Sequence, residues 1–171
     1  MYLDIVILSH LRTGPVHGYE LKRKVSATTA FTLNNNTLYP ALRRFEESGA
    51  VRKTAVQQEG RPPRHVYELT ADGREQLHDM IVELPAELAG HEEEFLCRLG
   101  LFDDLDPAER HGVLARRDAA LAAQLEHLQG LAEHTETSPA HRRWGGLVLA
   151  ELVGRIRRER EWLAELGRLA G

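Results

Sequence analysis

The most informative pattern in this chain lies in residues 34–70, which read NNNTLYPALRRFEESG followed by AVRKTAVQQEGRPPRHVYELT. Asparagine is a preferred N-cap residue, so we expect a helix to begin at the asparagine run 34–36 and to end at Gly49. Its apolar side chains recur at intervals of three and four, which predicts one buried face. They are Leu38, Ala41, Leu42 and Phe45.

The opposite side of this helix is polar from its first turn onward. It carries Asn36, Tyr39, Pro40, Arg43 and Glu47. Asn and Arg side chains at the start of a helix can donate to phosphates and reach the edges of bases. An ordinary solvent-exposed face gives the same pattern, so this arc alone leaves both interpretations open.

Beyond Gly49 the sequence changes from a helical to a strand pattern. Residues 50–56 and 64–70 are rich in β-formers, and the polar run 57–63 separates them, which predicts a β-hairpin with a long loop. The sides of the hairpin carry the cations Arg52, Lys53, Arg61 and Arg64, with Glu59 near the tip.

Two helices are expected before this segment. Apolar spacing predicts the first from Tyr2 to Arg12, where Thr13-Gly14-Pro15 stops it, and a shorter one fits Gly18 to about Ser26. Three short helices followed by a basic hairpin is the order of a winged helix-turn-helix domain. A fourth helix starts at Thr70 and ends or kinks at Pro85, and we place this domain at residues 1–84.

Residues 85–171 are predicted to be helical. A short helix is expected from His91 to about Leu101. Asp106-Pro107 opens a long helix over residues 107–134, with Asp as the N-cap and Pro at the first helical position. Thr137-Ser138-Pro139 starts a last helix that runs to about Leu169.

Both long helices carry an apolar stripe, interrupted by Asp118 in one and Glu159 in the other. The rest of this small chain offers little apolar surface to cover these stripes. We therefore expect a dimerisation module that resembles a coiled coil. The alternative is a monomeric helical hairpin. The residues predicted at the dimer interface are Leu114, Leu121, Leu125, Leu128, Leu149, Leu152, Ile156, Leu163 and Leu166. The predicted fold is mainly α, with an N-terminal winged helix-turn-helix followed by this helical domain.

Composition excludes several classes of protein. The formal net charge of the 171 residues is −4, divided into +2 for residues 1–82 and −6 for residues 83–171. The single Cys97 excludes an internal disulfide scaffold and fits a reducing cytoplasm. No apolar run approaches the roughly 20 residues that span a bilayer, so no membrane partner is expected. Catalytic motifs and helical zinc spacings are not visible, so we expect no enzyme, cofactor or metal site.

Several separate motifs resemble those of PadR-type transcriptional regulators, in the same order and at the same spacing. Residues 11–21, LRTGPVHGYEL, resemble the junction of the first two helices, and residues 35–44, NNTLYPALRR, resemble the recognition helix. Residues 60–62, GRP, and 67–74, YELTADGR, resemble the wing and the helix after it. Residues 92–96, EEEFL, and 104–107, DLDP, resemble the helical C-terminal domain of longer members.

The resemblance implies a homodimeric repressor that binds double-stranded DNA at a roughly palindromic operator. Carried over by position, the residues that would enter the major groove are Asn35, Asn36, Thr37, Tyr39 and Arg43. His17 and Tyr19 would touch the sugar–phosphate backbone. On the wing, Lys53, Arg61 and Arg64 would hold phosphates or reach into a minor groove. The resemblance favours the DNA interpretation of the polar arc over a plain solvent-exposed face.

Trp144 and Trp162 are the candidate effector-binding residues. The resemblance implies that a small aromatic or hydrophobic ligand releases the repressor from DNA, and an indole ring could stack on such a ligand. Packing in the core or in the dimer interface is the alternative for both. A different function is a protein–protein adaptor, in which the winged helix has lost DNA binding and the acidic second half recruits a partner.

Overall fold

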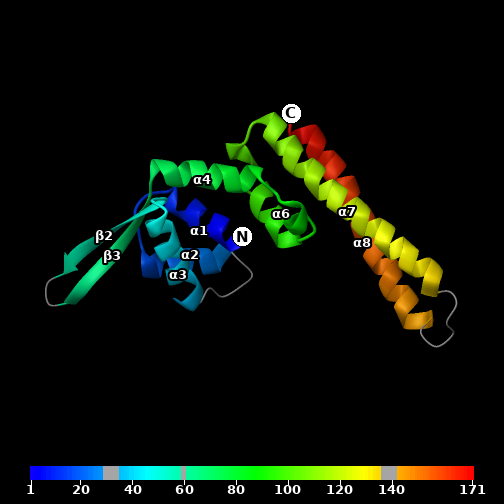
Figure 1. Cartoon of the computed structure of the whole chain (residues 1–171), viewed down its shortest axis with the longest axis horizontal. Coiled ribbons are helices and arrows are strands. Elements are labelled where there is room, and N and C mark those ends of the chain that lie inside the picture. The colour runs from blue at the N-terminus through cyan, green and yellow to red at the C-terminus, as the bar shows by residue number, and fades with distance from the viewer. Residues whose placement is uncertain (29–34, 59–60, 136–141) are drawn as a thin grey trace. The chain divides into compact units, whose positions relative to one another are not determined.

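The computed structural model describes residues 1–28, 35–58, 61–135 and 142–171, and these divide into two compact units, Met1–Ile81 and Val82–Gly171 (Figure 1). Each unit has a buried apolar core of its own. Some predictions fall outside the described residues, namely those on Asn34, Glu59, Gly60, Thr137, Ser138 and Pro139.

The first unit contains four helices and three strands among its described residues. The helices are α1 (Tyr2–Leu11), α2 (Gly18–Thr28), α3 (Asn35–Glu47) and α4 (Ala71–Val82), which ends at the unit boundary. The strands are β1 (Val16–His17), β2 (Val51–Gln58) and β3 (Arg61–Leu69). Three helices and a β-hairpin in this order confirm the predicted winged helix-turn-helix.

The three strands form one antiparallel sheet in the order β1-β3-β2. Val51 lies opposite Leu69 in the hairpin, and the two-residue β1 places Val16 opposite Tyr67. The sequence pattern did not predict β1, because two residues are too short to show an alternation. Its pairing matters for function, since it joins the start of α2 to the wing.

The buried face of α3 is the predicted one. Leu38, Ala41, Leu42 and Phe45 are each at most 5% exposed. Gly49 follows the helix with a positive φ of 79°, a conformation that glycine adopts without the strain that a Cβ would bring. The chain can therefore turn sharply from α3 into β2.

The second unit is helical. It contains α5 (Ala86–Ala89), α6 (Glu92–Leu99), a 3-10 turn η1 (Phe102–Asp104), α7 (Pro107–Thr135) and α8 (Arg142–Leu169). The α5 helix and the η1 turn were not predicted, because neither is long enough to show periodicity. The predicted start of α7 is confirmed, since Glu109 N–H donates to Asp106 Oδ1 and Asp106 N–H donates to Glu109 Oε2, both at 2.9 Å.

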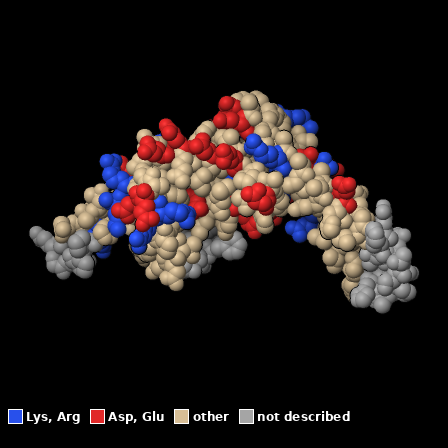
Figure 2. All heavy atoms as spheres, in the orientation of Figure 1, with Lys and Arg blue, Asp and Glu red and all other residues tan. Residues whose placement is uncertain are grey.

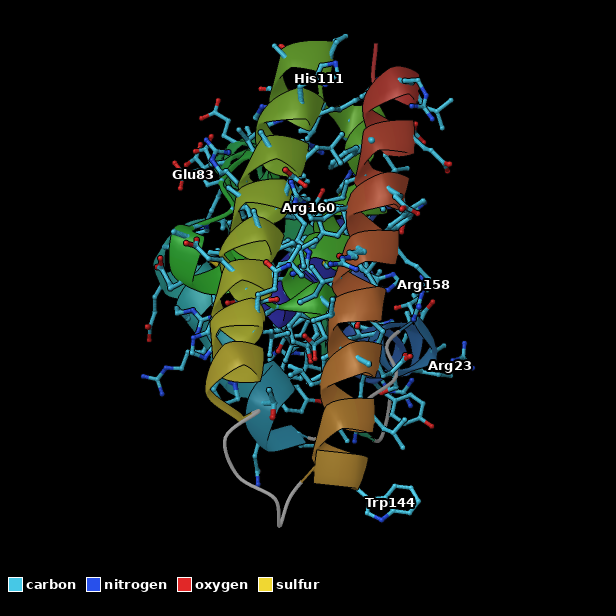
Figure 3. All side chains as sticks on the ribbon, turned by 90° about the vertical axis from the view of Figure 1, so that its right-hand side faces the viewer. Arg23, Glu83, His111, Trp144, Arg158 and Arg160 are labelled. Carbon is cyan, nitrogen blue, oxygen red and sulfur yellow. The ribbon has the colours of Figure 1, made fainter. Side chains whose placement is uncertain are left out.

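The helices α7 and α8 lie side by side in antiparallel directions (Figures 1 and 3). Their apolar stripes meet between them. Asp118 and Glu159, which interrupt these stripes, each form an ion pair with an arginine of the other helix. Arg117 binds Glu159 at 2.7 Å, and Arg160 binds Asp118 at 2.7 Å. None of the described helices is long and apolar enough to cross a membrane.

Candidate nucleic-acid interface

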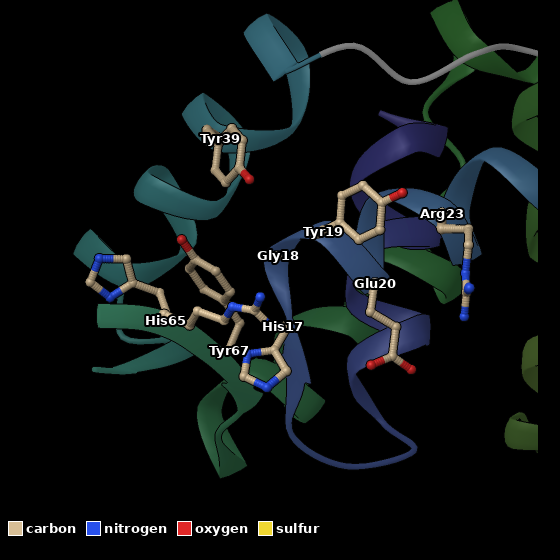
Figure 4. Close-up of a pocket in the computed structure, with 9 residues that line it drawn as sticks. His17, Gly18, Tyr19, Glu20, Arg23, Tyr39, His65 and Tyr67 are labelled. Carbon is tan, nitrogen blue, oxygen red and sulfur yellow. The ribbon is translucent and has the colours of Figure 1, made fainter. Parts of the chain in front are cut away.

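A surface hollow of about 470 Å³ lies in the first unit, where the start of α2 meets α3 and β3 (Figure 4). Side chains from all three elements line it. They are His17, Tyr19, Glu20, Arg23, Tyr39, Arg64, His65 and Tyr67, with Gly18 between them. Four of these residues, His17, Tyr19, Tyr39 and Arg64, are predicted DNA contacts. The fold therefore brings together positions that are up to 47 residues apart in the sequence.

The geometry of the hollow depends on Gly18. A Cβ at this position would lie 3.3 Å from both the Tyr39 and the Tyr67 rings, tighter than ordinary van der Waals contact. In Figure 4, Tyr39 from α3 and Tyr67 from β3 lie on one side of Gly18, and Tyr19 and Arg23 from α2 lie on the other. The absence of a side chain at Gly18 thus lets α3 approach the start of α2.

Tyr67 and His17 are two lining residues of the hollow whose polar groups are affected by burial. Tyr67 is only 5% exposed, and burial, reinforced by Tyr39 and Glu46, raises the pKa of its hydroxyl. A tyrosine hydroxyl already carries its proton at neutral pH, and the raised pKa keeps it a possible donor to a higher pH. The Nδ1 atom of His17 is buried and has no hydrogen-bond partner among the described residues.

The predicted recognition residues on α3 are all exposed. They are Asn35, Asn36, Thr37, Tyr39 and Arg43. Asn35 is held at the start of the helix, because Lys22 Nζ donates to its Oδ1 at 2.9 Å. Tyr39 alone among the five lines the hollow, so the other four belong to the helix surface next to it.

Several cations of this region lie next to carboxylates (Figure 2). Arg43 Nε donates to Glu47 Oε1 at 2.8 Å, and Lys53 lies 3.8 Å from Glu46. On the hairpin, Arg52 donates to Glu68 at 3.0 Å. The side chain of Arg61, another predicted contact, lies outside the described residues. This pairing lowers the positive potential that the surface offers to a polyanion.

Sequence reasoning missed Tyr67, His65 and Arg23 as members of the hollow. Tyr67 follows the strand pattern of a core residue, and the pairing of β1 with β3 is what places its ring beside Gly18. Arg23 lies one turn after Tyr19 on α2, and that helical spacing was the available signal.

The two candidate effector residues, Trp144 and Trp162, differ in exposure and in their contacts. Trp144 is 73% exposed at the start of α8 and extends away from the helices in Figure 3. Trp162 is 38% exposed, and its ring meets the edge of Phe95 at a centroid distance of 6.2 Å and an interplanar angle of 86°. Neither lines the cavity of about 390 Å³ in the second unit. That cavity has apolar walls from Leu121, Leu128, Leu152 and Ile156, with Gln124, His127, Glu92 and Arg155 among its polar residues.

The predicted dimer-interface residues fall into two groups in the single chain. Buried inside the α7–α8 pair, with at most 9% exposure, are Leu114, Leu121, Ile156 and Leu163. Leu125, Leu128, Leu149, Leu152 and Leu166 keep at least part of their surface accessible. Other large apolar side chains on the same two helices are at least 46% exposed, namely Leu131, Trp144, Leu147, Val148 and Leu169.

Cys97 and the metal-ligating side chains of the described residues are the groups on which reactive or metal chemistry would depend. Burial raises the pKa of the Cys97 thiol to about 11, so the thiolate is scarce at neutral pH. Within the described ranges, no group of three or more His, Cys, Asp or Glu side chains is arranged to hold a metal.

Comparison with known proteins finds one family and several relatives. Residues 7–79 match the transcriptional regulator PadR-like family. The chain is similar to the probable transcriptional regulator Rv1176c of Mycobacterium tuberculosis, with 35% identity over 85 residues that make up 48% of this chain and 45% of the relative. The match thus spans less than half of that relative's length.

Solved structures give similar results. Bacillus subtilis PadR in complex with operator DNA is 22% identical, with 100% of both chains covered and a TM-score of 0.44. A PadR family transcription regulator from Clostridium difficile R20291 is 32% identical over 46% of this chain and 81% of that chain, with a TM-score of 0.42. The chain therefore carries, in residues 7–79, a domain of the transcriptional regulator PadR-like family.

Proposed function

We propose that this protein is a DNA-binding transcriptional regulator that acts as a homodimeric repressor at a palindromic operator. Residues 1–84 would bind DNA, and residues 85–171 would join two copies. The N-terminal domain belongs to a family of transcriptional regulators and not of enzymes. The observation that carries the proposal is the exposed N-terminal half of α3 beside the hollow bordered by α2 and β3.

In this proposal, α3 enters the major groove, which is wide enough to admit a helix. Asn35 and Asn36 at its start could each contact an adenine edge, and Arg43 one turn beyond Tyr39 could contact a guanine edge. The sugar–phosphate strand next to the groove would lie along the hollow. There the Tyr67 hydroxyl and Arg64 could donate to phosphate oxygens.

The salt dependence of binding tests whether DNA is the partner. If each protomer neutralises about four phosphates, the log–log slope of the dimer's affinity against salt is about −7, from about −0.9 per phosphate. Fluorescence anisotropy with the DNA upstream of the protein's own gene measures this slope. Failure to bind that DNA at low salt would overturn the proposal and favour a protein–protein adaptor.

The substitution Tyr39→Ala tests the site itself. Tyr39 is 43% exposed and lines the hollow, so its removal should weaken operator binding at least tenfold while the protein stays folded. Ala150→Glu, on the exposed side of α8 in the second unit, serves as the control and should leave DNA affinity unchanged. Equal operator affinities of Tyr39→Ala and wild type would exclude the hollow as the DNA site.

The proposal of a homodimer rests on the exposed apolar side chains of α7 and α8. Leu147 and Val148 are 57% and 59% exposed, and Leu131 is 46% exposed. Large apolar side chains grouped in this way are typical of a protein–protein contact. A second copy of the helical pair could cover them together with the accessible members of the predicted interface.

We also propose a small aromatic or hydrophobic effector that binds the second unit and releases DNA. The exposed Trp144 ring and the apolar cavity beside Leu121 and Leu152 support this part. The test is a titration of phenols and of polycyclic aromatic cations against wild type, Trp144→Phe and Trp162→Phe. Tryptophan fluorescence measures ligand binding, and anisotropy of labelled DNA measures release. Ligands that bind the protein but leave its DNA affinity unchanged would refute a release mechanism.

A further inference from the structure

Glu47, the last residue of α3, holds Arg43 through one defined contact. Arg43 Nε donates to Glu47 Oε1 at 2.8 Å, and both side chains are largely exposed, at 80% and 63%. The hydrogen bond uses the Nε–H of the guanidinium and leaves the N–H groups of Nη1 and Nη2 available. In this conformation the ion pair directs the arginine side chain, and the outer edge of the guanidinium remains available to donate.

Helix stability gives little reason for a glutamate at this position. The C-terminal end of a helix carries partial negative charge, so a carboxylate in the last turn is unfavourable. An acidic residue that follows its basic partner by four positions is also the weaker order of such a pair. Because both partners are exposed, the pair contributes little to folding. A role in positioning Arg43 explains the glutamate better.

The position of Arg43 makes such a role useful. It lies one turn beyond Tyr39, which lines the hollow, on the exposed side of α3. A guanidinium that presents its two Nη groups side by side matches the O6 and N7 acceptors of guanine. A long flexible arginine loses rotamer entropy when it binds, and a carboxylate that already holds Nε reduces that loss.

We propose that Glu47 is a positioning residue that determines base specificity, because it presents the Nη edge of Arg43 to a guanine. This inference rests on the proposed function, since it requires that α3 meets DNA. Its carboxylate also repels phosphates, which disfavours contacts of Arg43 with the backbone of unrelated sequences. Glu47 thus strengthens binding to the correct site and weakens binding to random DNA.

Glu46 provides a matched control. It is the neighbouring residue on the same helix and is exposed. Its carboxylate lies 3.8 Å from Lys53 on β2, and Lys53 takes the place that Arg43 has for Glu47. Glu46→Gln removes the same charge from nearly the same place. It removes a repulsive charge and releases Lys53, a predicted phosphate contact, and both effects should strengthen binding to every DNA sequence by a similar factor. Only Glu47→Gln should change the ratio of specific to random affinity.

The experiment uses full-length protein and two DNA probes. One is a duplex that wild-type protein enriches from a random pool, and the other is a shuffled duplex of the same composition. We expect Glu47→Gln to bind the enriched duplex less tightly and the shuffled one more tightly. The ratio of the two affinities should fall about fivefold or more, the lower end of what a bidentate base contact contributes. Glu46→Gln should leave this ratio near the wild-type value.

Two further measurements tie the effect to Arg43. In the Arg43→Ala background, Glu47→Gln should no longer change the ratio. Replacing single guanines of the enriched duplex by 7-deazaguanine, which lacks the N7 acceptor, should weaken wild-type binding at one position and leave the binding of Arg43→Ala unchanged. Thermal unfolding checks the fold, and the Tm of Glu47→Gln should equal or exceed the wild-type Tm.

The outcomes separate this inference from the proposed function. If wild-type protein enriches no sequence, the proposed DNA-binding function fails, and this inference fails with it. If a sequence is enriched but Glu47→Gln behaves like Glu46→Gln, the DNA-binding function stands and the positioning role of Glu47 is wrong. An effect of Glu47→Gln that persists without Arg43 would overturn the positioning role as well.

Discussion

Gly73 lies in the first turn of α4, where the helix passes close to the start of β2. A Cβ at this position would overlap with the carbonyl oxygen of Ala50 and lie 2.7 Å from Cδ1 of Leu69. Its backbone N–H donates to Thr70 Oγ1 at 3.0 Å, while the Thr70 hydroxyl donates to the Gly49 carbonyl at 2.7 Å. Glycine is needed here because the backbone of another element occupies the space of a side chain.

We expect Gly73→Ala to lower the free energy of unfolding by about 1–3 kcal/mol, as overpacking of a tight contact does. Gly167→Ala in α8 is the control, because the described residues place no atom within 4 Å of its added Cβ. It should stabilise the protein by about 0.5–1 kcal/mol through helix propensity. Urea denaturation followed by circular dichroism measures both, and a Gly73→Ala protein as stable as wild type would contradict the contact.

Two arginines, one on α6 and one on α7, donate hydrogen bonds to backbone carbonyls near the start of the second unit. Arg98, which is fully buried, donates from Nε to the Glu83 carbonyl at 3.1 Å and from Nη1 to Glu94 Oε2 at 2.7 Å. Arg117, 2% exposed, donates from Nη1 to the Ala89 carbonyl at 2.8 Å. These guanidiniums join α6 and α7 to the segment that follows α4.

Removing one member of the buried Arg98–Glu94 pair should lower the free energy of unfolding more than removing both members. We expect Arg98→Met to destabilise the protein by about 3–5 kcal/mol, because Glu94 keeps a buried charge without its partner. The double variant Arg98→Met/Glu94→Leu should recover much of this loss, since it removes both charges of the pair. Denaturation of wild type and the two variants measures the difference. A double variant that is no more stable than the single one would show that the carbonyl contact of Arg98 dominates.

The Asp118–Arg160 pair across α7 and α8 makes stability depend on pH. The hydrogen bond from Arg160 lowers the pKa of the Asp118 carboxyl, against an opposing effect of partial burial. Because the folded-state pKa lies below the unfolded one, this carboxylate stabilises the fold above the unfolded pKa of about 4 and ceases to do so as the pH falls through the folded value.

Asp118→Asn should therefore be less stable than wild type at pH 7, and the two stabilities should converge as the pH approaches 2. The difference should be small, because the pair is partly exposed to solvent and salt. Glu151→Gln, which removes an exposed pair with Arg158 inside α8, is the control. Thermal unfolding at several pH values measures the difference. A gap that is independent of pH would show that the asparagine perturbs packing instead.

Taken as a whole, the molecule separates its tasks between two units. Residues 1–82 carry a net charge of only +2, and several of their cations are paired with carboxylates, so shape and hydrogen bonding must supply much of any DNA recognition. The second unit is acidic and carries exposed apolar side chains on α7 and α8. Acidic surface repels phosphate, whereas apolar surface favours contact with protein.

A glutamate in place of Val148 should separate a dimer into monomers without unfolding them. Val148 is 59% exposed in the single chain, so a charge there does not disturb the core but would be buried in the proposed interface. Sedimentation equilibrium should give twice the 19.3 kDa chain mass for wild type and 19.3 kDa for Val148→Glu. Ala150→Glu, on another exposed side of α8, should remain dimeric. A wild-type protein of 19.3 kDa would refute the dimer.

Local periodicity and capping chemistry predict most of this fold from the sequence. The buried face of α3 and the Asp106 cap of α7 each depend on residues at most seven positions apart, and each strand of the hairpin shows its pattern within a similarly short run, so neighbouring letters carry the signal. The exposed positions on α3 follow from the same periodicity. Their relation to DNA comes from the resemblance of motifs rather than from spacing.

Contacts between distant segments are not encoded in such local patterns. The pairing of Val16 with Tyr67 builds the hollow, and the approach of α3 to Gly18 closes it, yet no local periodicity in the sequence indicates that these segments meet. The same holds for Leu121 and Ile156, whose stripes fit either a partner helix in the chain or a second copy. The structure buries both inside the α7–α8 pair, because a hydrophobic stripe specifies that it must be covered and leaves open what covers it.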